Sequence, residues 1–131
     1  MSQHIFIYGT LRPGLAPDEI ACAVEKLRIV GEGSVRGVLY DLGEYPGAVV
    51  SAAAHSRIHG MVFELPEDAD VLRELDRYEG FNPEAVAESL FVREEQMVEL
   101  LDGHALSCWI YVYNFEPVGA RIIPEGRYRE K

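Results

Sequence analysis

Glu79 is the residue of this sequence best placed to carry a proton. It follows Tyr78 and precedes Gly80, at the predicted C-terminus of a helix. The C-terminal end of a helix is electrically negative, and an apolar environment removes water from a charge. Both effects raise the pKa of a carboxyl group toward the range that is useful for proton transfer. The alternative is a solvated surface glutamate beside a helix cap, because glutamate is rarely buried.

A second candidate is the stretch at residues 4–14, which begins as a strand and then stops abruptly. Residues 5–8 are all strand formers, Gly9 interrupts the ladder, Thr10 offers a hydroxyl, and residues 13–14 (Pro-Gly) favour a turn. Backbone N–H groups at the end of a buried strand can hold an anionic group or a developing oxyanion. The alternative is a core strand followed by an ordinary turn.

The sequence lacks the usual signatures of a protein nucleophile or a long phosphate loop. It has no serine in a nucleophile elbow, no cysteine beside a histidine and no extended glycine-rich phosphate motif. Catalysis through a serine or cysteine nucleophile therefore has weak support. Acid–base chemistry at a carboxylate is the chemistry that remains.

Metal binding is not indicated by the cysteines and histidines. The two cysteines, Cys22 in a predicted helix and Cys108 in a predicted strand, are expected to be buried free thiols, with a disulfide as the alternative. The histidines have no carboxylate or cysteine partner at zinc-site spacing. They are His4, His55, His59 and His104. We expect no metal and no cofactor.

Length and charge restrict the class of protein. The chain has 131 residues, of which 48% are hydrophobic, so residues 1–131 are expected to form one domain with a single core. A formal net charge of −10 argues against nucleic acid and against anionic membrane surfaces as partners. No signal peptide and no membrane-spanning run is recognised. We therefore expect a cytoplasmic protein that binds a small molecule, with the monomer and the homodimer both open.

The first half of the chain predicts one short helix and several strands. The helix is expected at residues 16–24, and a long bent strand at residues 27–40. Glycines within this strand predict bulges or tight barrel corners, and they are Gly31, Gly33 and Gly37. Shorter strands are expected at residues 48–50 and 58–65.

Residues 66–78 form the clearest predicted helix. Apolar residues recur at helical spacing along one stripe, which comprises Val71, Leu72, Leu75 and Tyr78. Charged residues are expected to cover the other face, and they are Arg73, Glu74, Asp76 and Arg77. Gly80 is a typical C-terminal stop, so Glu79 belongs to the last turn.

The final third predicts strands at residues 86–93, 96–101 and 105–114, with an Asp-Gly hairpin turn at residues 102–103. Both faces of the strand at 105–114 are apolar or aromatic, so this strand should be central and largely buried. The tail is expected to cover the barrel surface. We therefore predict an α+β fold: a small mixed, mostly antiparallel β-barrel of about six strands with one or two flanking helices.

Four motifs occur in an order that resembles the gamma-glutamylcyclotransferase-like family, in its avirulence-induced-gene-like branch. They are Tyr-Gly-Thr-Leu at residues 8–11, Tyr-Pro-Gly-Ala at 45–48, Leu-Asp-Arg-Tyr-Glu-Gly at 75–80 and a tyrosine-rich strand at 109–113. The resemblance covers essentially the whole chain. It implies the small mixed barrel, and an enzyme in which the α-amine of the substrate attacks its own γ-glutamyl amide carbonyl. The products would be 5-oxoproline and a free amine.

The resemblance also implies roles for individual residues. Glu79 would be the catalytic acid and base, since the nucleophile belongs to the substrate. Backbone N–H groups of the loop would hold the oxyanion and the substrate carboxylate. The implied substrate-binding residues are Tyr8, Gly9, Thr10, Leu11, Tyr45 and Tyr113. Arg12 is either a carboxylate contact or an exposed loop charge, whereas His4 and Trp109 are expected to be structural.

Two other functional classes stay open from the sequence. The same fold could be a non-catalytic module that binds a small molecule, in which case Glu79 should point away from a closed pocket. A protein-interaction domain would need an exposed apolar patch, and the sequence shows none beyond the expected core faces. The amine half of the substrate is also open: glutathione-derived compounds, gamma-glutamyl amino acids, gamma-glutamyl-lysine isopeptides and other gamma-glutamyl metabolites all fit.

Overall fold

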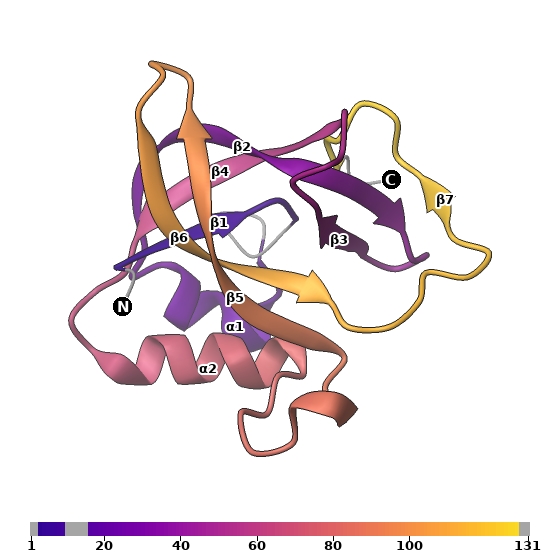
Figure 1. The fold of residues 1–131 in the computed structure, drawn as a ribbon. Helices are drawn as coiled ribbons and strands as arrows, with labels where there is room; N and C mark the ends of the chain where they lie inside the picture. Colours follow the sequence, from indigo (N-terminus) through magenta and orange to yellow (C-terminus); the bar gives the residue numbers. More distant parts are fainter. Residues whose placement is uncertain (1–2, 10–15, 129–131) are drawn as a thin grey trace.

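The computed structural model describes residues 3–9 and 16–128, and Figure 1 shows a strand barrel flanked by two helices. Within these residues the elements occur in the order β1 (His4–Ile7), α1 (Asp18–Val24), β2 (Arg28–Asp41), β3 (Pro46–Val50), β4 (Arg57–Glu64), α2 (Ala69–Glu79), a 3₁₀ turn η1 (Val86–Glu88), β5 (Phe91–Leu100), β6 (Ala105–Tyr113) and β7 (Arg121–Ile122). The predicted α+β class is confirmed.

Five strands close into a barrel in the order β2, β4, β1, β6 and β5, and β5 pairs with β2 to complete the circle. The pairings are antiparallel except that β1 and β6 run parallel, with Ile5 opposite Trp109. The short strands β3 and β7 pair with the C-terminal part of β2 outside this circle. The predicted mixed, mostly antiparallel barrel is therefore confirmed, with β6 in the central position that its sequence indicated.

The length and bend of β2 let one strand serve two sheets. Its first part pairs with β4 and β5, and its last part pairs with β3. A register shift lies between Ile29 and Gly31, as the glycines indicated. A Cβ at Gly33 would lie 2.7 Å from Val98 Cγ1, and one at Gly37 would lie 2.5 Å from the Val49 carbonyl oxygen. These glycines therefore mark places where neighbouring strands approach closely.

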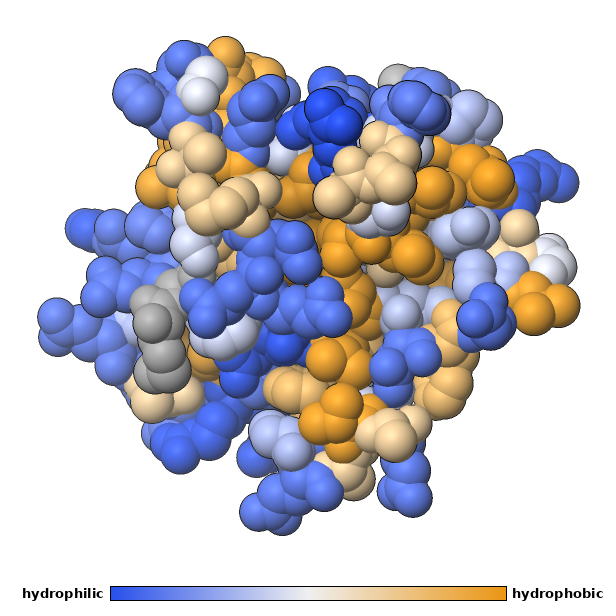
Figure 2. All heavy atoms as spheres, in the orientation of Figure 1, coloured by the Kyte–Doolittle hydropathy of each residue, from blue (hydrophilic) through white to orange (hydrophobic). Residues whose placement is uncertain are grey.

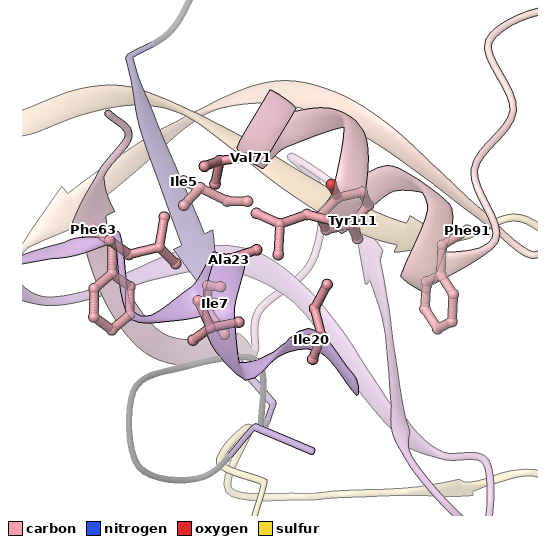
Figure 3. Packing of buried hydrophobic residues seen from close by; sticks show 11 residues of the cluster. Ile5, Ile7, Ile20, Ala23, Phe63, Val71, Phe91 and Tyr111 are labelled. Atoms are coloured by element: carbon pink, nitrogen blue, oxygen red, sulfur yellow. The ribbon is translucent and has the colours of Figure 1, made fainter. Parts of the chain in front are cut away.

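Alternation along the strands divides the apolar side chains between two cores. In β1, Phe6 points into a cluster inside the barrel, whereas Ile5 and Ile7 join a second cluster on the helix side. Figure 3 shows this second cluster, in which Ile20 of α1 and Val71 of α2 pack around the β1 side chains. The two helices thus cover one outer face of the barrel.

Helix α2 is bounded by two caps. The Asp68 carboxylate accepts a hydrogen bond from the Asp70 N–H at 2.9 Å, so the helix begins three residues later than residue 66. Gly80 ends it with φ of 75°, as predicted from its type. Burial of Val71 and Leu75 holds the helix on the barrel and stabilises it by about 1.5–3 kcal/mol for each side chain.

The region after α2 differs from the prediction. Residues 86–88 form η1 rather than a strand, and the two strands expected at 86–93 and 96–101 are one strand, β5. The Ser89 hydroxyl donates to the Ala85 carbonyl oxygen, and the Asn114 amide donates to the carbonyl oxygens of Val86 and Ser89. These side-chain bonds replace strand pairing in this segment.

Two further expectations need correction. Cys108 is a buried free thiol as predicted, but Cys22 is exposed, because α1 buries Ile20, Ala23 and Val24 instead. Asp76 was expected on the polar face of α2, yet it is buried. The strand β7 was not predicted, since two residues carry no periodic signal.

The surface includes some large apolar side chains. Figure 2 shows hydrophilic residues around the outline of one face and a band of hydrophobic residues through its middle. The most exposed large hydrophobic residues are Ile29, Met97, Leu101 and Val118. Among the described residues, no helix is both long and apolar enough to cross a membrane.

Candidate active site

A cavity of about 970 Å³ lies where the end of β1 meets the end of α2. Its size is that of a typical small-molecule site. Its wall also includes residues of α1, of the connection between β2 and β3, of β5 and β6, and of the C-terminal segment. Its lining includes Tyr8, Gly9, Glu19, Glu44, Tyr45, Arg77, Tyr78, Glu79, Phe91, Tyr111 and Tyr128.

Glu79 lines this cavity as the last residue of α2. It is partly buried, and burial raises the pKa of its carboxyl group from 4.5 to about 7. Glu79 lies four residues after the buried Leu75, so the packed face of α2 fixes where the helix end points. A carboxyl group with this pKa can both accept and return a proton near neutral pH.

The negative charge of Glu79 contributes to the raised pKa values of three tyrosines. Burial raises the pKa of Tyr8, and the Glu79 carboxylate raises it further. Burial is also the main cause of the raised pKa values of Tyr78 and Tyr111, to which Glu79 contributes as well. All three phenols therefore stay protonated at neutral pH. They come from the end of β1, from α2 and from β6, so the carboxylate lies where three elements meet.

The hydroxyl group of Tyr8 connects three strands. It donates to the Tyr111 carbonyl oxygen at 2.5 Å and accepts from the Ala48 N–H at 3.3 Å. Tyr8 follows the last residue of β1, Tyr111 belongs to β6 and Ala48 belongs to β3. The predicted site residue Tyr8 is therefore in the cavity wall, and its hydroxyl also fixes the strand that leads into the Gly9 loop.

Gly9 lines the cavity directly after Tyr8. A Cβ at this position would lie 3.4 Å from Pro46 Cγ, so a side chain would contact the opposite wall. Two other predicted loop residues, Thr10 and Leu11, lie outside the described residues, as does Arg12. Of the residues predicted in this loop, the structure thus places Gly9 in the wall of the cavity that Glu79 lines.

Aromatic rings form one side of the cavity. Tyr45 is 38% exposed and packs edge-on against Phe91, with ring centroids 5.8 Å apart. Phe91 packs in the same way against Tyr113 at 5.7 Å. Tyr45 and Phe91 line the cavity, whereas Tyr113 lies behind Phe91 and is not among the described lining residues. Phe91 was not singled out from the sequence, because an aromatic residue at a strand start is typical of a core.

A buried polar cluster supports the cavity from behind. The Asp76 carboxylate accepts hydrogen bonds from Arg93 and from the Tyr111 hydroxyl. Sequence reasoning did not predict these contacts, since Asp76 and Arg93 lie on different elements, 17 residues apart. The spacing of Asp76 and Glu79, three residues apart at a helix end, was the signal that could have drawn attention to Asp76.

The site has the groups for proton transfer and ligand binding. Among the described lining residues there is no serine, cysteine or histidine, and among the described residues no group of three or more His, Cys, Asp or Glu is arranged to hold a metal ion. Glu79 is the lining carboxylate whose pKa is raised into the neutral range. The arrangement suits acid–base catalysis at a carboxyl group that titrates near neutral pH.

Comparison with known proteins gives a consistent family. A family model described as gamma-glutamyl cyclotransferase, AIG2-like matches residues 5–130. The gamma-glutamylcyclotransferase family protein ytfP of Citrobacter rodentium is 29% identical over 128 residues, which is 97% of this chain and 96% of that protein. The corresponding protein of Escherichia coli K12 is 28% identical over the same shares.

Solved structures agree on the fold. The solution structure of ytfP from Escherichia coli matches with a TM-score of 0.64 and 28% identity, over 95% of both chains. The crystal structure of an AIG2-like protein from Mus musculus matches with a TM-score of 0.72 and 21% identity, over 98% of this chain and 88% of that one.

Proposed function

Because this chain belongs to the gamma-glutamyl cyclotransferase, AIG2-like family, we propose that it is an enzyme that converts a gamma-glutamyl amide into 5-oxoproline and a free amine. The observation that carries the proposal is the Glu79 carboxyl group, with its pKa raised to about 7, on the wall of a cavity of ligand size. The likeness to the solved structures supports the fold, and the chemistry rests on this site.

The reaction closes a five-membered lactam within the substrate. Glu79 takes a proton from the substrate α-ammonium group, and the freed nitrogen attacks the γ-carbonyl carbon. The resulting tetrahedral intermediate carries an oxyanion, and its C–N bond to the leaving amine then breaks. In all, the attacking nitrogen loses two protons and the leaving nitrogen gains two, and Glu79 carries them one at a time. Water and an enzyme nucleophile take no part.

The remaining predicted residues hold the substrate in this proposal. The backbone N–H groups of Gly9, Thr10 and Leu11 would face the oxyanion or the α-carboxylate. Folding the glutamyl chain back on itself supplies proximity, which is a large contribution to such a cyclisation. Tyr45 would contact the substrate directly, whereas Tyr113 would act through the Phe91 ring against which it packs.

Replacement of the carboxylate tests this function. Glu79→Gln is expected to lower kcat by about 10²–10⁴-fold, because general acid–base catalysis is typically worth that much. The purified protein would be offered a panel of gamma-glutamyl amides, and 5-oxoproline would be quantified. Glu84→Gln is the matched control, since it removes an exposed carboxylate outside the described lining of the cavity and should keep most of the activity.

Equal rates for the wild-type protein and Glu79→Gln would contradict the role of Glu79. If the wild-type protein released no 5-oxoproline from any member of the panel, the enzymatic proposal itself would fail.

A further inference from the structure

We propose that Asp76 and Arg93 are a positioning pair that anchors the end of α2 against the barrel. Their opposite charges cancel, so that the pair exerts no net charge on the Glu79 carboxylate. This inference rests on the role of Glu79 proposed above. Neither residue lines the cavity beside the Glu79 carboxylate, so the pair would act through Glu79 rather than on the substrate.

The geometry of the pair is that of a fixed, two-point contact. Arg93 Nε donates to Asp76 Oδ1 at 2.7 Å, and Arg93 Nη2 donates to Asp76 Oδ2 at 3.1 Å. The Asp76 side chain is 8% exposed and the Arg93 side chain 15%. A bidentate pair sets the orientation of both groups as well as their distance.

Aromatic rings enclose the guanidinium group. Its central carbon lies 4.2 Å from the ring centroid of Trp109 on β6 and 5.6 Å from that of Phe81, which follows α2. A cation on an aromatic face is stabilised and shielded from water there. Arg93 therefore has one well-defined position, between the strand that bears it and the end of α2.

A third donor connects the pair to the cavity wall. The Tyr111 hydroxyl donates to Asp76 Oδ1 at 2.7 Å, and the Tyr111 backbone carbonyl accepts the hydroxyl of Tyr8. A single carboxylate thus joins α2 to β5 and β6, and through Tyr8 to the end of β1. These are the elements that bring Glu79 and the Gly9 loop together.

The charges of the pair also bear on the ionisation of Glu79. Asp76 and Glu79 are three residues apart on a helix, where side chains are neighbours about 5–6 Å apart at Cβ. A buried carboxylate without a partner would repel the ionised form of Glu79, and a buried cation without a partner would attract it. Together the two charges cancel, which agrees with burial being the cause of the raised pKa of Glu79.

Other groups that face Glu79 are neutral or lie at the solvent side. The neutral ones are the phenols of Tyr8 directly after β1, Tyr78 on α2 and Tyr111 on β6. The charged ones on the cavity wall are Glu19 of α1, Glu44 of the connection between β2 and β3, and Arg77 of α2, all of which are at least partly exposed. Among the described residues, Asp76 and Arg93 thus form a largely buried charged pair that joins the helix bearing Glu79 to β5.

Direct titration of Glu79 tests the pair. The carboxyl ¹³C resonance of Glu79, assigned by its loss in Glu79→Gln, would be followed against pH by NMR in Asp76→Asn, Arg93→Met and the double variant. We expect the Glu79 midpoint to fall by about one pH unit in Asp76→Asn and to rise by about one pH unit in Arg93→Met. The double variant should return close to the wild-type midpoint.

A merely structural role predicts a different pattern. If the pair only held the fold together, each single variant would loosen the helix end and admit water, so both would lower the midpoint toward 4.5. A fall in Arg93→Met would therefore overturn the proposal. Arg93→Lys keeps the charge without the two-point geometry, so its Glu79 midpoint should equal that of the wild-type protein. A rise of the Glu79 midpoint in Arg93→Lys as large as in Arg93→Met would also overturn the proposal.

The titration needs no substrate, so it separates this inference from the proposed function. A protein that released no 5-oxoproline but showed opposite shifts in the two single variants would contradict the enzymatic proposal and support the charge balance. An active protein in which both variants shifted the midpoint downward would support the enzymatic proposal and contradict the charge balance. Circular dichroism of each variant would establish that the fold is retained.

Discussion

Burial of Glu79 favours proton transfer near neutral pH but lowers the stability of the folded protein when the carboxyl group ionises. Burial raises the pKa of its carboxyl group from 4.5 to about 7. Below pH 4.5 the group is protonated in both the folded and the unfolded chain, and it does not affect the free energy of unfolding. Between pH 4.5 and 7 the unfolded chain ionises first, so folded-state stability is progressively lost as pH rises. The full linkage is about 3 kcal/mol, and partial exposure reduces it to about 2 kcal/mol.

Removing the charge should therefore stabilise the protein at high pH. We expect Glu79→Gln to equal the wild-type protein in unfolding free energy at pH 4 and to exceed it by about 2 kcal/mol at pH 8.5. Urea unfolding at both pH values measures this difference. Glu84→Gln is the control, since Glu84 is exposed and should change stability by less than about 0.5 kcal/mol at either pH. Equal stability of Glu79→Gln and wild type at pH 8.5 would show that Glu79 ionises without a folding cost.

At the scale of elements, close contacts between strands make individual glycines necessary. A Cβ at Gly60 of β4 would lie 2.4 Å from the Ile7 carbonyl oxygen of β1 and 2.9 Å from Phe6 Cζ. We expect Gly60→Ala to destabilise the protein by about 2–4 kcal/mol, because the neighbouring backbone must move. Thermal unfolding would measure this loss.

Gly31→Ala is the matched control for this substitution. Gly31 also lies in a barrel strand, but apart from Gly31 itself and its two chain neighbours, no atom of the described residues lies within 4 Å of the position that its Cβ would take. We expect less than about 0.5 kcal/mol of change. Similar losses in the two variants would mean that glycine flexibility, and not strand approach, explains the effect at residue 60.

The elements also show what the sequence could predict. Alternation in β1 and β6 predicted strands with two buried faces, and the helical repeat of Val71 and Leu75 with Gly80 predicted the end of α2. These signals are local, since each depends on which side of one element is buried. The start of the strand predicted at residues 86–93 was wrong, because residues 86–88 form η1 and backbone carbonyl groups there accept side-chain hydrogen bonds from Ser89 and Asn114 that no periodicity reveals. Residues 91–93 do belong to a strand, β5.

The candidate site was predictable in part for the same reason. Glu79 and the Tyr8–Gly9 segment were expected in one pocket, and the structure brings them to the same cavity. The supporting contact between Asp76 and Arg93 was missed, because it depends on the position of β5 against α2. Tertiary placement of this kind does not follow from a single element. A charged residue on a predicted helix is assigned to solvent unless its partner is known.

At the scale of the whole molecule, charge should influence which amine leaves the site. The chain carries a net charge of −10, and Glu19 and Glu44 lie on the cavity wall together with Arg77. We expect gamma-glutamyl amides whose leaving amine bears a second positive charge to be turned over with a higher kcat/KM than those whose leaving amine bears a carboxylate. The preference should shrink as salt is added, since exposed charges are screened.

Neutralising the two wall carboxylates tests this expectation. The double variant Glu19→Gln/Glu44→Gln should lose the preference by about fivefold, which corresponds to about 1 kcal/mol at an exposed site. The double variant Glu84→Gln/Glu88→Gln removes the same charge away from the cavity and should keep the preference. Equal losses in both would assign the effect to net charge alone.

The parallel neighbour of β1 has a consequence for how the protein is made. β1 is the first strand among the described residues, yet it lies between β4 and β6, and the Tyr8 hydroxyl donates a hydrogen bond to the carbonyl oxygen of Tyr111, 103 residues later. A ribosome releases the chain from its N-terminus at about 5–20 residues per second. The Gly9 loop and Glu79 therefore emerge seconds before the strand that completes their pocket. Until β6 has been made, the nascent chain has the proton carrier without the complete cavity, so any catalysis at this site has to wait for β6.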